Sequence, residues 1–324
     1  MQGLLIVNPR ATTTSPRVTD VLVGALGREL DLHVLETTHR GHGYQLGREA
    51  CGAVDIVITL GGDGIIHEVV NGMLAEGPGA QVPILAPVPG GSGNVFVRAL
   101  GIPAHPVEAT GHLVQALRAG HVRTVGLGQL VHLDAQGSVC GKPDWFTANA
   151  GLGIDAEVIA AMEQQRAIGA QATPARYLAT TLRTWLRGVD RTRPQLRLVA
   201  GDGRTADHVF LAIVQNTAPW TYFGSVPINP CPDAAFERGL DIFALRSLSA
   251  AATSRAIAEM LAGLPIPALP LGRFRREPIL RWPDIAALDV VAREPIALQV
   301  DGEFSGEVWG ARFSAVANAL RVAC

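Results

Sequence analysis

The chain has 324 residues, of which 48% are hydrophobic and 17% are charged, and its formal net charge at pH 7 is −2. This length and apolar content argue against disorder and predict two domains of moderate size rather than one core. The near-neutral charge gives no reason to expect a nucleic-acid partner, because a phosphate backbone is usually met by a basic surface.

The cysteines and the N-terminal residues bear on the cellular compartment. Cys51, Cys140, Cys231 and Cys324 have no paired spacing, which predicts neither a zinc site nor a disulfide framework. The N-terminal apolar run lacks the basic start and cleavage site of a signal peptide, and no uninterrupted apolar stretch has the length of a membrane span. We therefore expect a cytoplasmic protein.

Strand and helix patterns alternate in the first third of the chain. Apolar runs predict strands, and apolar residues at helical spacing predict helices. The predicted strands are 4–8, 31–36, 55–60 and 83–88, and the predicted helices are 18–30, 42–51, 65–74, 95–100 and 106–119. Continuous apolar strands separated by helices predict a parallel sheet that is covered on both faces.

Strand patterns dominate from Val122 onward, broken by Gly, Pro and Asp turns. The predicted strands are 124–130, 146–150, 195–199, 209–215, 240–245, 288–292, 296–300 and 312–316, and the predicted helices are 156–165, 175–188 and 250–263. We expect an α/β domain at 1–125 and a β-rich, sandwich-like domain at 126–324. Whether the C-terminal segment returns to the first domain is left open.

Two glycine loops each follow a predicted strand and precede a predicted helix. The first is residues 61–64 (GGDG), and the second is residues 89–94 (PGGSGN). Glycine lets backbone N–H groups approach an anion closely, and the end of a helix adds a favourable dipole. Since ligands bind at the carboxyl ends of parallel strands, two such loops can converge on one phosphate chain. The plainer alternative is a pair of ordinary strand-to-helix turns.

Six ordered motifs resemble the diacylglycerol kinase and sphingosine kinase superfamily of lipid kinases. Residues 61–72 (GGDGIIHEVVNG) resemble the first signature of its catalytic domain, and residues 89–94 with the following 96–103 resemble the second. Residues 8–10 (NPR), Thr37, residues 149–155 (NAGLGID) and residues 301–303 (DGE) resemble further motifs of that family. The resemblance implies a fold like that of NAD kinase and diacylglycerol kinase, and a kinase that uses ATP and Mg²⁺.

The resemblance also implies a set of site residues. It places at the ATP site Asn8, Pro9, Arg10, Thr37, Gly61, Gly62, Gly64, Ile65, Ile66, His67, Gly91, Ser92 and Asn94. Asp63 would contact the metal and the phosphates, and Asp155 would hold the head group of the substrate. Glu303 is the first candidate for the base that accepts the proton of the acceptor hydroxyl, with Asp63 second. Asp301 would support the metal or the loop.

Several of these residues have a structural alternative. An Asp-Gly pair such as 301–302 also suits a tight hairpin turn, and Asp155 could cap the helix that follows it. For His67, which lies in a predicted helix, packing is the better interpretation.

Two positions depart from the family pattern. Val95 stands where many bacterial diacylglycerol kinases have Asp, and Arg238 stands where the family often has Asp near a structural magnesium ion. A cation at 238 opposes a bound metal, so we predict that this structural site is lost.

The expected acceptor is a diacylglycerol, a sphingoid base or a similar apolar alcohol. An apolar segment, 255–271, precedes Arg273, Arg275 and Arg276, which suits peripheral contact with a membrane surface but also an ordinary packed helix. A non-lipid metabolite as acceptor, an NAD kinase and a nucleotide-binding regulator without catalysis remain alternatives. A homodimer is left open.

Overall fold

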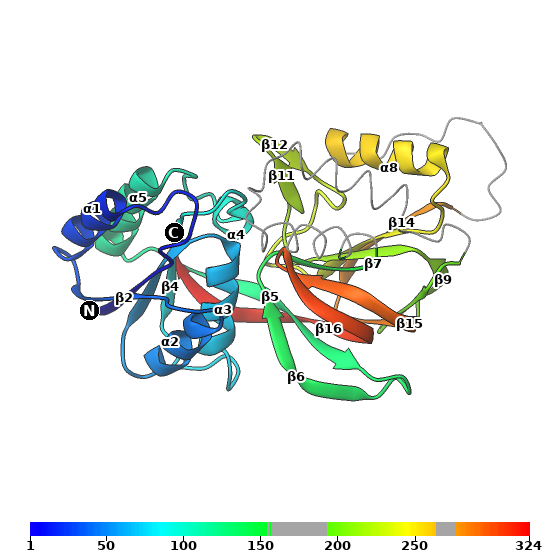
Figure 1. Ribbon diagram of the computed structural model, residues 1–324, viewed down its shortest axis with the longest axis horizontal. Coiled ribbons are helices and arrows are strands. Elements are labelled where there is room, and N and C mark those ends of the chain that lie inside the picture. Colours follow the sequence, from blue (N-terminus) through cyan, green and yellow to red (C-terminus); the bar gives the residue numbers. More distant parts are fainter. Residues whose placement is uncertain (154–155, 157–192, 264–276) are drawn as a thin grey trace. The chain divides into compact units, whose positions relative to one another are not determined.

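The computed structural model of the chain describes residues 1–153, 156, 193–263 and 277–324 (Figure 1). These residues form two compact units. The first comprises Met1–Leu127 and Val316–Cys324, and the second comprises Gly128–Ala315. Among the described residues, no helix is long and apolar enough to cross a membrane. The predicted helices 156–165 and 175–188 lie outside the described residues, apart from residue 156.

The first unit is built on a parallel sheet. Four of its strands are β1 (Gln2–Val7), β2 (Asp31–Glu36), β3 (Ile56–Gly61) and β4 (Ile84–Pro89). They run parallel in the order β4-β3-β1-β2, and the end of β16 (Glu303–Ala323) pairs with β4 through Val322 and Leu85. Strands β1, β3 and β4 are buried almost throughout, as expected for apolar runs in a sheet covered on both faces.

Five helices accompany this sheet in the sequence order of an α/β fold. They are α1 (Pro16–Leu26), α2 (His42–Ala50), α3 (Asp63–Met73), α4 (Val95–Ala99) and α5 (Pro106–Ala119). Helix α1 packs with α5, and α2 packs with α3 (Figure 1). The adjacent strands β1 and β3 are followed by α1 and α3, respectively. These two helices belong to different pairs, α1 with α5 and α3 with α2. Such a switch point is where ligands bind in open α/β sheets.

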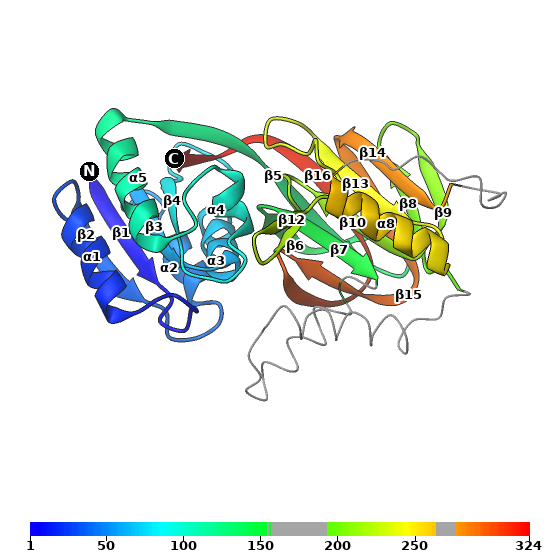
Figure 2. The same ribbon diagram turned by 90° about the horizontal axis from the view of Figure 1, so that it is seen from above.

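The second unit consists mainly of antiparallel strands. They are β5 (Val122–Leu133), which enters from the first unit, β6 (Val139–Phe146), β7 (Asn149–Gly153), β8 (Leu196–Ala200), β9 (Thr205–Val209), β10 (Leu211–Gln215), β13 (Leu240–Leu245), β14 (Ile279–Ile285) and β15 (Ala287–Val300). The main path is β14-β13-β10-β7-β15-β16. A separate hairpin joins β11 (Thr221–Phe223) to β12 (Val226–Ile228), and α8 (Ala250–Ala262) lies across β10 and β13 (Figure 2).

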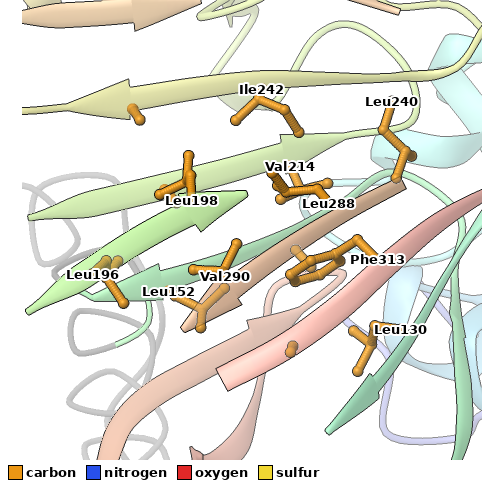
Figure 3. Packing of buried hydrophobic residues seen from close by; sticks show 14 of the residues in the cluster. Leu130, Leu152, Leu196, Leu198, Val214, Leu240, Ile242, Leu288, Val290 and Phe313 are labelled. Atoms are coloured by element: carbon orange, nitrogen blue, oxygen red, sulfur yellow. The ribbon is translucent and has the colours of Figure 1, made fainter. Parts of the chain in front are cut away.

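One apolar cluster fills the second unit. Its side chains come from ten strands and include the fully buried Leu152, Val214, Ile242, Val290 and Phe313 (Figure 3). The predicted division into a parallel α/β part and a strand-rich part is thus confirmed.

Five predicted strands of the second part differ from the structure. Residues 288–292 and 296–300 belong to one strand, β15, whose register shifts between Val291 and Ile296. Residues 209–215 divide between β9, which ends at Val209, and β10, which begins at Leu211. The strand predicted at 312–316 is only the middle of β16. The strand predicted at 146–150 spans the break between β6, which ends at Phe146, and β7, which begins at Asn149.

Candidate active site

Backbone hydrogen bonds join the carboxyl ends of the strands in the first unit. The N–H of Asn8 donates to the carbonyl oxygen of Leu60 at 3.0 Å, which joins the end of β1 to that of β3. The N–H of Thr37 donates to the carbonyl oxygen of Val7 at 2.9 Å, which joins the end of β2 to β1. Two predicted nucleotide ligands, Asn8 and Thr37, are therefore brought to one edge of the sheet.

The two glycine loops pack against each other at this same edge. The N–H of Gly90 donates to the carbonyl oxygen of Gly61 at 2.6 Å. A Cβ atom added at Gly90 would lie 2.8 Å from the Cα of Gly61, and one at Gly91 would lie 2.6 Å from the Cα of Gly62. Any larger residue would separate the loops, so glycine is required for the contact. The convergence predicted from the sequence is present within this unit.

Asp63 connects the first loop to the second. It is the first residue of α3, whose N-cap residue Gly62 provides no side-chain cap. Its Oδ1 atom accepts a hydrogen bond from the N–H of Phe96 at 3.2 Å, and its Oδ2 atom lies 3.0 Å from the position of a Cβ at Gly93. The carboxylate is partly exposed. It therefore lies beside the positive end of a helix dipole, where phosphate groups are favoured.

The exposed residues of the site lie in two loops. Pro9 and Arg10 are exposed after β1, and the N–H of Arg10 donates to the Oδ1 atom of Asn8 at 3.0 Å. Ser92 is exposed in the second glycine loop. Gly64 is partly exposed in the first turn of α3. These groups are placed where an anion could reach them.

Asn94, predicted as a nucleotide ligand, shapes its own loop. It has a φ of 50° and is 6% exposed. Its Oδ1 atom accepts from the N–H of Gly91 at 3.0 Å, and its Nδ2 atom donates to the Gly91 carbonyl oxygen at 2.7 Å. Both ends of the amide thus hold the loop, and a contact between Asn94 and a nucleotide stays a prediction.

Three further predicted ligands, Ile65, Ile66 and His67, have side-chain neighbours in the core or within α3. Ile65 and Ile66 are 5% and 0% exposed and belong to the core, so only backbone atoms could serve a ligand. The N–H of Ile66 is used within the helix, donating to the Gly62 carbonyl oxygen at 3.4 Å. His67 contacts Asn71 one turn later in α3, with 3.4 Å between its Nδ1 atom and the Asn71 Nδ2 atom. This favours the packing interpretation of His67.

Glu68 has a role that its position in the sequence does not reveal. Its two carboxylate oxygens accept from the N–H groups of Gly41 at 2.8 Å and Gly43 at 2.9 Å. These groups begin α2, whose N-cap Gly41 has a φ of 85° and no capping side chain. Glu68 of α3 therefore caps a neighbouring helix and fixes the loop that follows Thr37. The only local signal is a helix start without Ser, Thr, Asp or Asn.

In the second unit, Asp301 is the centre of a buried hydrogen-bond cluster. Its carboxylate accepts from the N–H groups of Thr147 at 2.9 Å, Ala148 at 2.8 Å and Asn149 at 3.2 Å, and from the Thr147 hydroxyl at 3.1 Å. These bonds divert residues 147 and 148 from the strand ladder, which explains the break between β6 and β7. Asp301 and Gly302 have φ values of 48° and 82°, the conformation of a tight hairpin turn. Of the roles expected for Asp301, the geometry favours support of the loop.

Glu303 follows this turn as the first residue of β16. It is partly buried and pairs with Val300 across the hairpin. The N–H of Gly302 donates to the Oε1 atom of Gln299 at 2.9 Å, and the Nε2 atom of Gln299 donates to the Oδ1 atom of Asn149 at 2.9 Å. Buried amides therefore fix the backbone that carries Glu303. The predicted head-group residue Asp155 lies outside the described residues.

Arg238, the cation that departs from the family pattern, lies near Asp233 and Asp241. Its Nη1 atom donates to the Asp233 carbonyl oxygen at 3.1 Å, and the N–H of Asp284 donates to Asp241 at 2.9 Å. Burial raises the pKa of Asp241, and the charge of Arg238 opposes that rise. Within the described ranges, no cluster of three or more His, Cys, Asp or Glu side chains could hold a metal ion. The loss of a structural magnesium site stays a prediction.

Comparison with known proteins shows what the first unit resembles. Residues 2–130 match the family described as the diacylglycerol kinase catalytic domain. A diacylglycerol kinase of Bacillus subtilis (strain 168) is 36% identical over 105 residues, which are 32% of this chain and 32% of the relative. A probable lipid kinase, YegS-like, of Stenotrophomonas maltophilia is 25% identical over 283 residues, covering 86% of this chain and 82% of the relative.

Solved structures show the same fold along nearly the whole chain. A putative diacylglycerol kinase from Bacillus anthracis has a TM-score of 0.73 at 23% identity, covering 99% of this chain and 96% of that one. A yeast NADH kinase has a TM-score of 0.51 at 11% identity, covering 99% and 82%. The resemblance predicted from the sequence is confirmed: residues 2–130 match the diacylglycerol kinase catalytic domain, and the fold is that of solved diacylglycerol kinase structures.

Proposed function

We propose that this protein is a lipid kinase, which transfers the γ-phosphate of ATP to the hydroxyl of a diacylglycerol, a sphingoid base or a similar apolar alcohol. The observation that carries the proposal is the contact between the two glycine loops, with the Asp63 carboxylate joining them, in a diacylglycerol kinase catalytic domain. Phosphoryl transfer is mostly positioning and neutralisation of charge, and this arrangement supplies both.

The triphosphate would lie along the loops at the strand ends. Backbone N–H groups at the start of a helix point along its axis toward the positive end of the dipole, so the start of α3 at Gly62 and Asp63 is suited to phosphate oxygens. Arg10 adds a positive charge from the loop after β1. Thr37 and Asn8, held by the ends of β2 and β1, would contact the rest of the nucleotide.

The residues present fit a magnesium ion carried in with the nucleotide. Mg²⁺ commonly takes one or two carboxylates together with phosphate oxygens and water. Asp63 is a partly exposed carboxylate oriented by its hydrogen bond to Phe96. The metal would neutralise charge that develops on the transferred phosphoryl group.

A second carboxylate would accept the proton of the acceptor hydroxyl. The hydrogen bonds that surround Asp301 support Glu303 for this task, because the Asp301 oxygens already accept four donors. Glu303 is partly exposed on a backbone that the buried amides hold in place. Asp63 is the second candidate for the base.

The test is a screen with radiolabelled ATP against diacylglycerol, sphingosine, ceramide, monoacylglycerol, a cellular lipid extract and NAD. We expect transfer to a lipid alcohol and none to NAD. Asp63→Asn and Glu303→Gln should each lower the rate by about 10²–10⁴-fold, the range typical of a lost acid–base group. The amide introduced by Asp63→Asn keeps an acceptor oxygen for the N–H of Phe96, so circular dichroism should show an intact fold.

Several outcomes would contradict the proposal. Near wild-type rates in both variants on the true substrate would refute the site. Transfer to NAD alone would identify an NAD kinase, and transfer only to a water-soluble metabolite would exclude the lipid acceptor. A protein that binds ATP without turning over any acceptor would be a regulator.

A further inference from the structure

The turn between β15 and β16, which precedes Glu303, is bonded inward at both of its central residues. These are Asp301 and Gly302, and the ladder bonds of a hairpin come from the residues on either side of them, so their N–H groups must find partners elsewhere. The N–H of Asp301 donates to the Asn149 carbonyl oxygen at 2.8 Å. The N–H of Gly302 donates to the Oε1 atom of Gln299 at 2.9 Å.

Two buried side-chain amides, those of Gln299 and Asn149, form a row that leads away from this turn. They are 1% and 5% exposed. The Nε2 atom of Gln299 donates to the Oδ1 atom of Asn149 at 2.9 Å, and the Nδ2 atom of Asn149 donates to the Trp220 carbonyl oxygen at 2.9 Å. Reversing either amide would set donor against donor or acceptor against acceptor. The backbone of Trp220, just before β11, therefore fixes the direction in which Gln299 presents its oxygen to Gly302.

A turn that only reverses the chain does not need such a row. The turn between β8 and β9 shows the simpler arrangement, because its Asp202 is exposed and bonds to Arg204, two residues further on. Buried amides must be fully bonded to be tolerated, whereas apolar side chains of the same size would fill the space without that requirement. A fully bonded row instead selects one conformation of the backbone. Here that conformation belongs to the two residues before Glu303.

We propose that Gln299 and Asn149 are positioning residues for proton transfer to Glu303. They act through the backbone of the turn and not on the reacting atoms. The proposal rests on the proposed function, in which Glu303 accepts the proton of the acceptor hydroxyl. Such a base must lie within hydrogen-bond reach of that hydroxyl, and a displacement of about 1 Å can lower the rate by about 10²-fold.

The first experiment measures steady-state kinetics of Gln299→Met, which keeps the length of the side chain and removes its amide. The acceptor is a dispersed short-chain diacylglycerol or sphingosine, whichever the wild type phosphorylates faster. We expect kcat to fall by about 10–100-fold, because the base is misplaced, while KM for ATP changes by less than about twofold. An unchanged kcat would overturn the proposal.

Gln215→Met is the matched control. Gln215 is 0% exposed, its Nε2 atom donates to the Thr217 carbonyl oxygen at 3.0 Å, and its Oε1 atom accepts from the N–H of Cys231 at 3.1 Å. The control thus also removes two hydrogen bonds from a buried amide, but away from the turn. Urea denaturation should show similar losses of stability in the two variants, and only Gln299→Met should lose kcat. Equal losses of kcat would show a merely structural role and overturn the proposal.

A double variant tests whether the two amides act in series. Asn149→Leu is close in shape to the wild-type side chain and leaves the backbone bonds of residue 149 in place. It should lower kcat as Gln299→Met does, and the double variant should be no slower than the poorer single variant. Losses that multiply would show two independent effects and overturn the row.

Hydrogen exchange read by mass spectrometry needs no turnover. Peptides that contain Gly302 should exchange faster in Gln299→Met than in the wild type, and Gln215→Met should leave them unchanged. If this exchange rises but the wild type phosphorylates no acceptor, the proposed function fails while the row still holds the turn. If the wild type phosphorylates its acceptor and Gln299→Met matches it, the kinase stands and the positioning role fails.

Discussion

The carboxylate of Asp301 accepts hydrogen bonds from three consecutive N–H groups, those of residues 147–149, and from the Thr147 hydroxyl. Asparagine is nearly the same shape, but its NH₂ group would face N–H donors. Two buried donors would then lose their acceptor. We expect Asp301→Asn to lower the free energy of unfolding by about 2–4 kcal/mol. Urea denaturation followed by circular dichroism measures this.

Glu303→Gln is the matched control, two residues away on the same hairpin. It should change the free energy of unfolding by no more than about 1 kcal/mol while reducing phosphoryl transfer. Equal stability of the two variants would show that the Asp301 hydrogen bonds do not hold the loop.

At the scale of elements, glycine residues bring the backbones of α2 and α3 close together. A Cβ added at Gly72 of α3 would lie 2.1 Å from the carbonyl oxygen of Tyr44, and one at Gly47 of α2 would lie 2.4 Å from that of Val69. The contact is between backbones, so side-chain movement cannot relieve it. This close packing brings Glu68 within reach of the start of α2.

Gly72→Ala should therefore destabilise the first unit by about 3 kcal/mol or more, as expected for overpacking against rigid backbone. Gly111→Ala in α5 is the control, because nothing lies within 4 Å of its added Cβ. There the change should stabilise by about 0.5–1 kcal/mol through helix propensity. Thermal melting separates the two. A Gly72→Ala melting temperature at or above that of Gly111→Ala would refute the close contact.

The helices and strands of the first unit were predictable from the local sequence pattern. The residues at which they begin and end depend on individual capping residues. Helix α1 begins at Pro16 rather than at 18, because Ser15 caps it by accepting from the N–H of Val18 at 3.3 Å. It stops before the predicted residue 30, at Leu26, with Gly27 as its C-cap. The break at residues 147–148 was not predictable, since its cause, Asp301, lies more than 150 positions along the chain.

The residues at the candidate site could be predicted better than their tasks. The glycine pattern indicated where backbone meets backbone, and the structure brings those loops together. The role of each side chain depends on residues that it contacts outside its own motif, and the motif does not specify these residues. Asn94 turns back to Gly91, Ile66 enters the core, and Glu68 caps α2 from a different helix.

At the scale of the whole molecule, the first unit is assembled from two separate parts of the chain. Residues 316–324 complete its sheet, with Leu320 and Val322 buried to 1% and 0% exposure. The Nη2 atom of Arg321 donates to the Val82 carbonyl oxygen at 2.7 Å. A fragment that lacks this segment would leave one edge of β4 open.

Deleting residues 316–324 should lower the stability of the first unit by about 3 kcal/mol or more, because two large apolar side chains leave the core. Hydrogen exchange read by mass spectrometry should show faster exchange in β4. Arg321→Ala removes one hydrogen bond only and should leave β4 close to the wild-type rate. Unchanged protection of β4 in the truncated chain would contradict the pairing of β16 with β4.

This split assembly imposes an order on biosynthesis. The ribosome releases β1 to β4 early. The segment that completes their sheet, residues 316–324, follows only after residues 128–315 have been made. At typical translation speeds, the nascent sheet waits roughly 10–40 s with an uncovered edge. During that interval the intervening unit can finish folding first, and chaperones have time to shield the incomplete one.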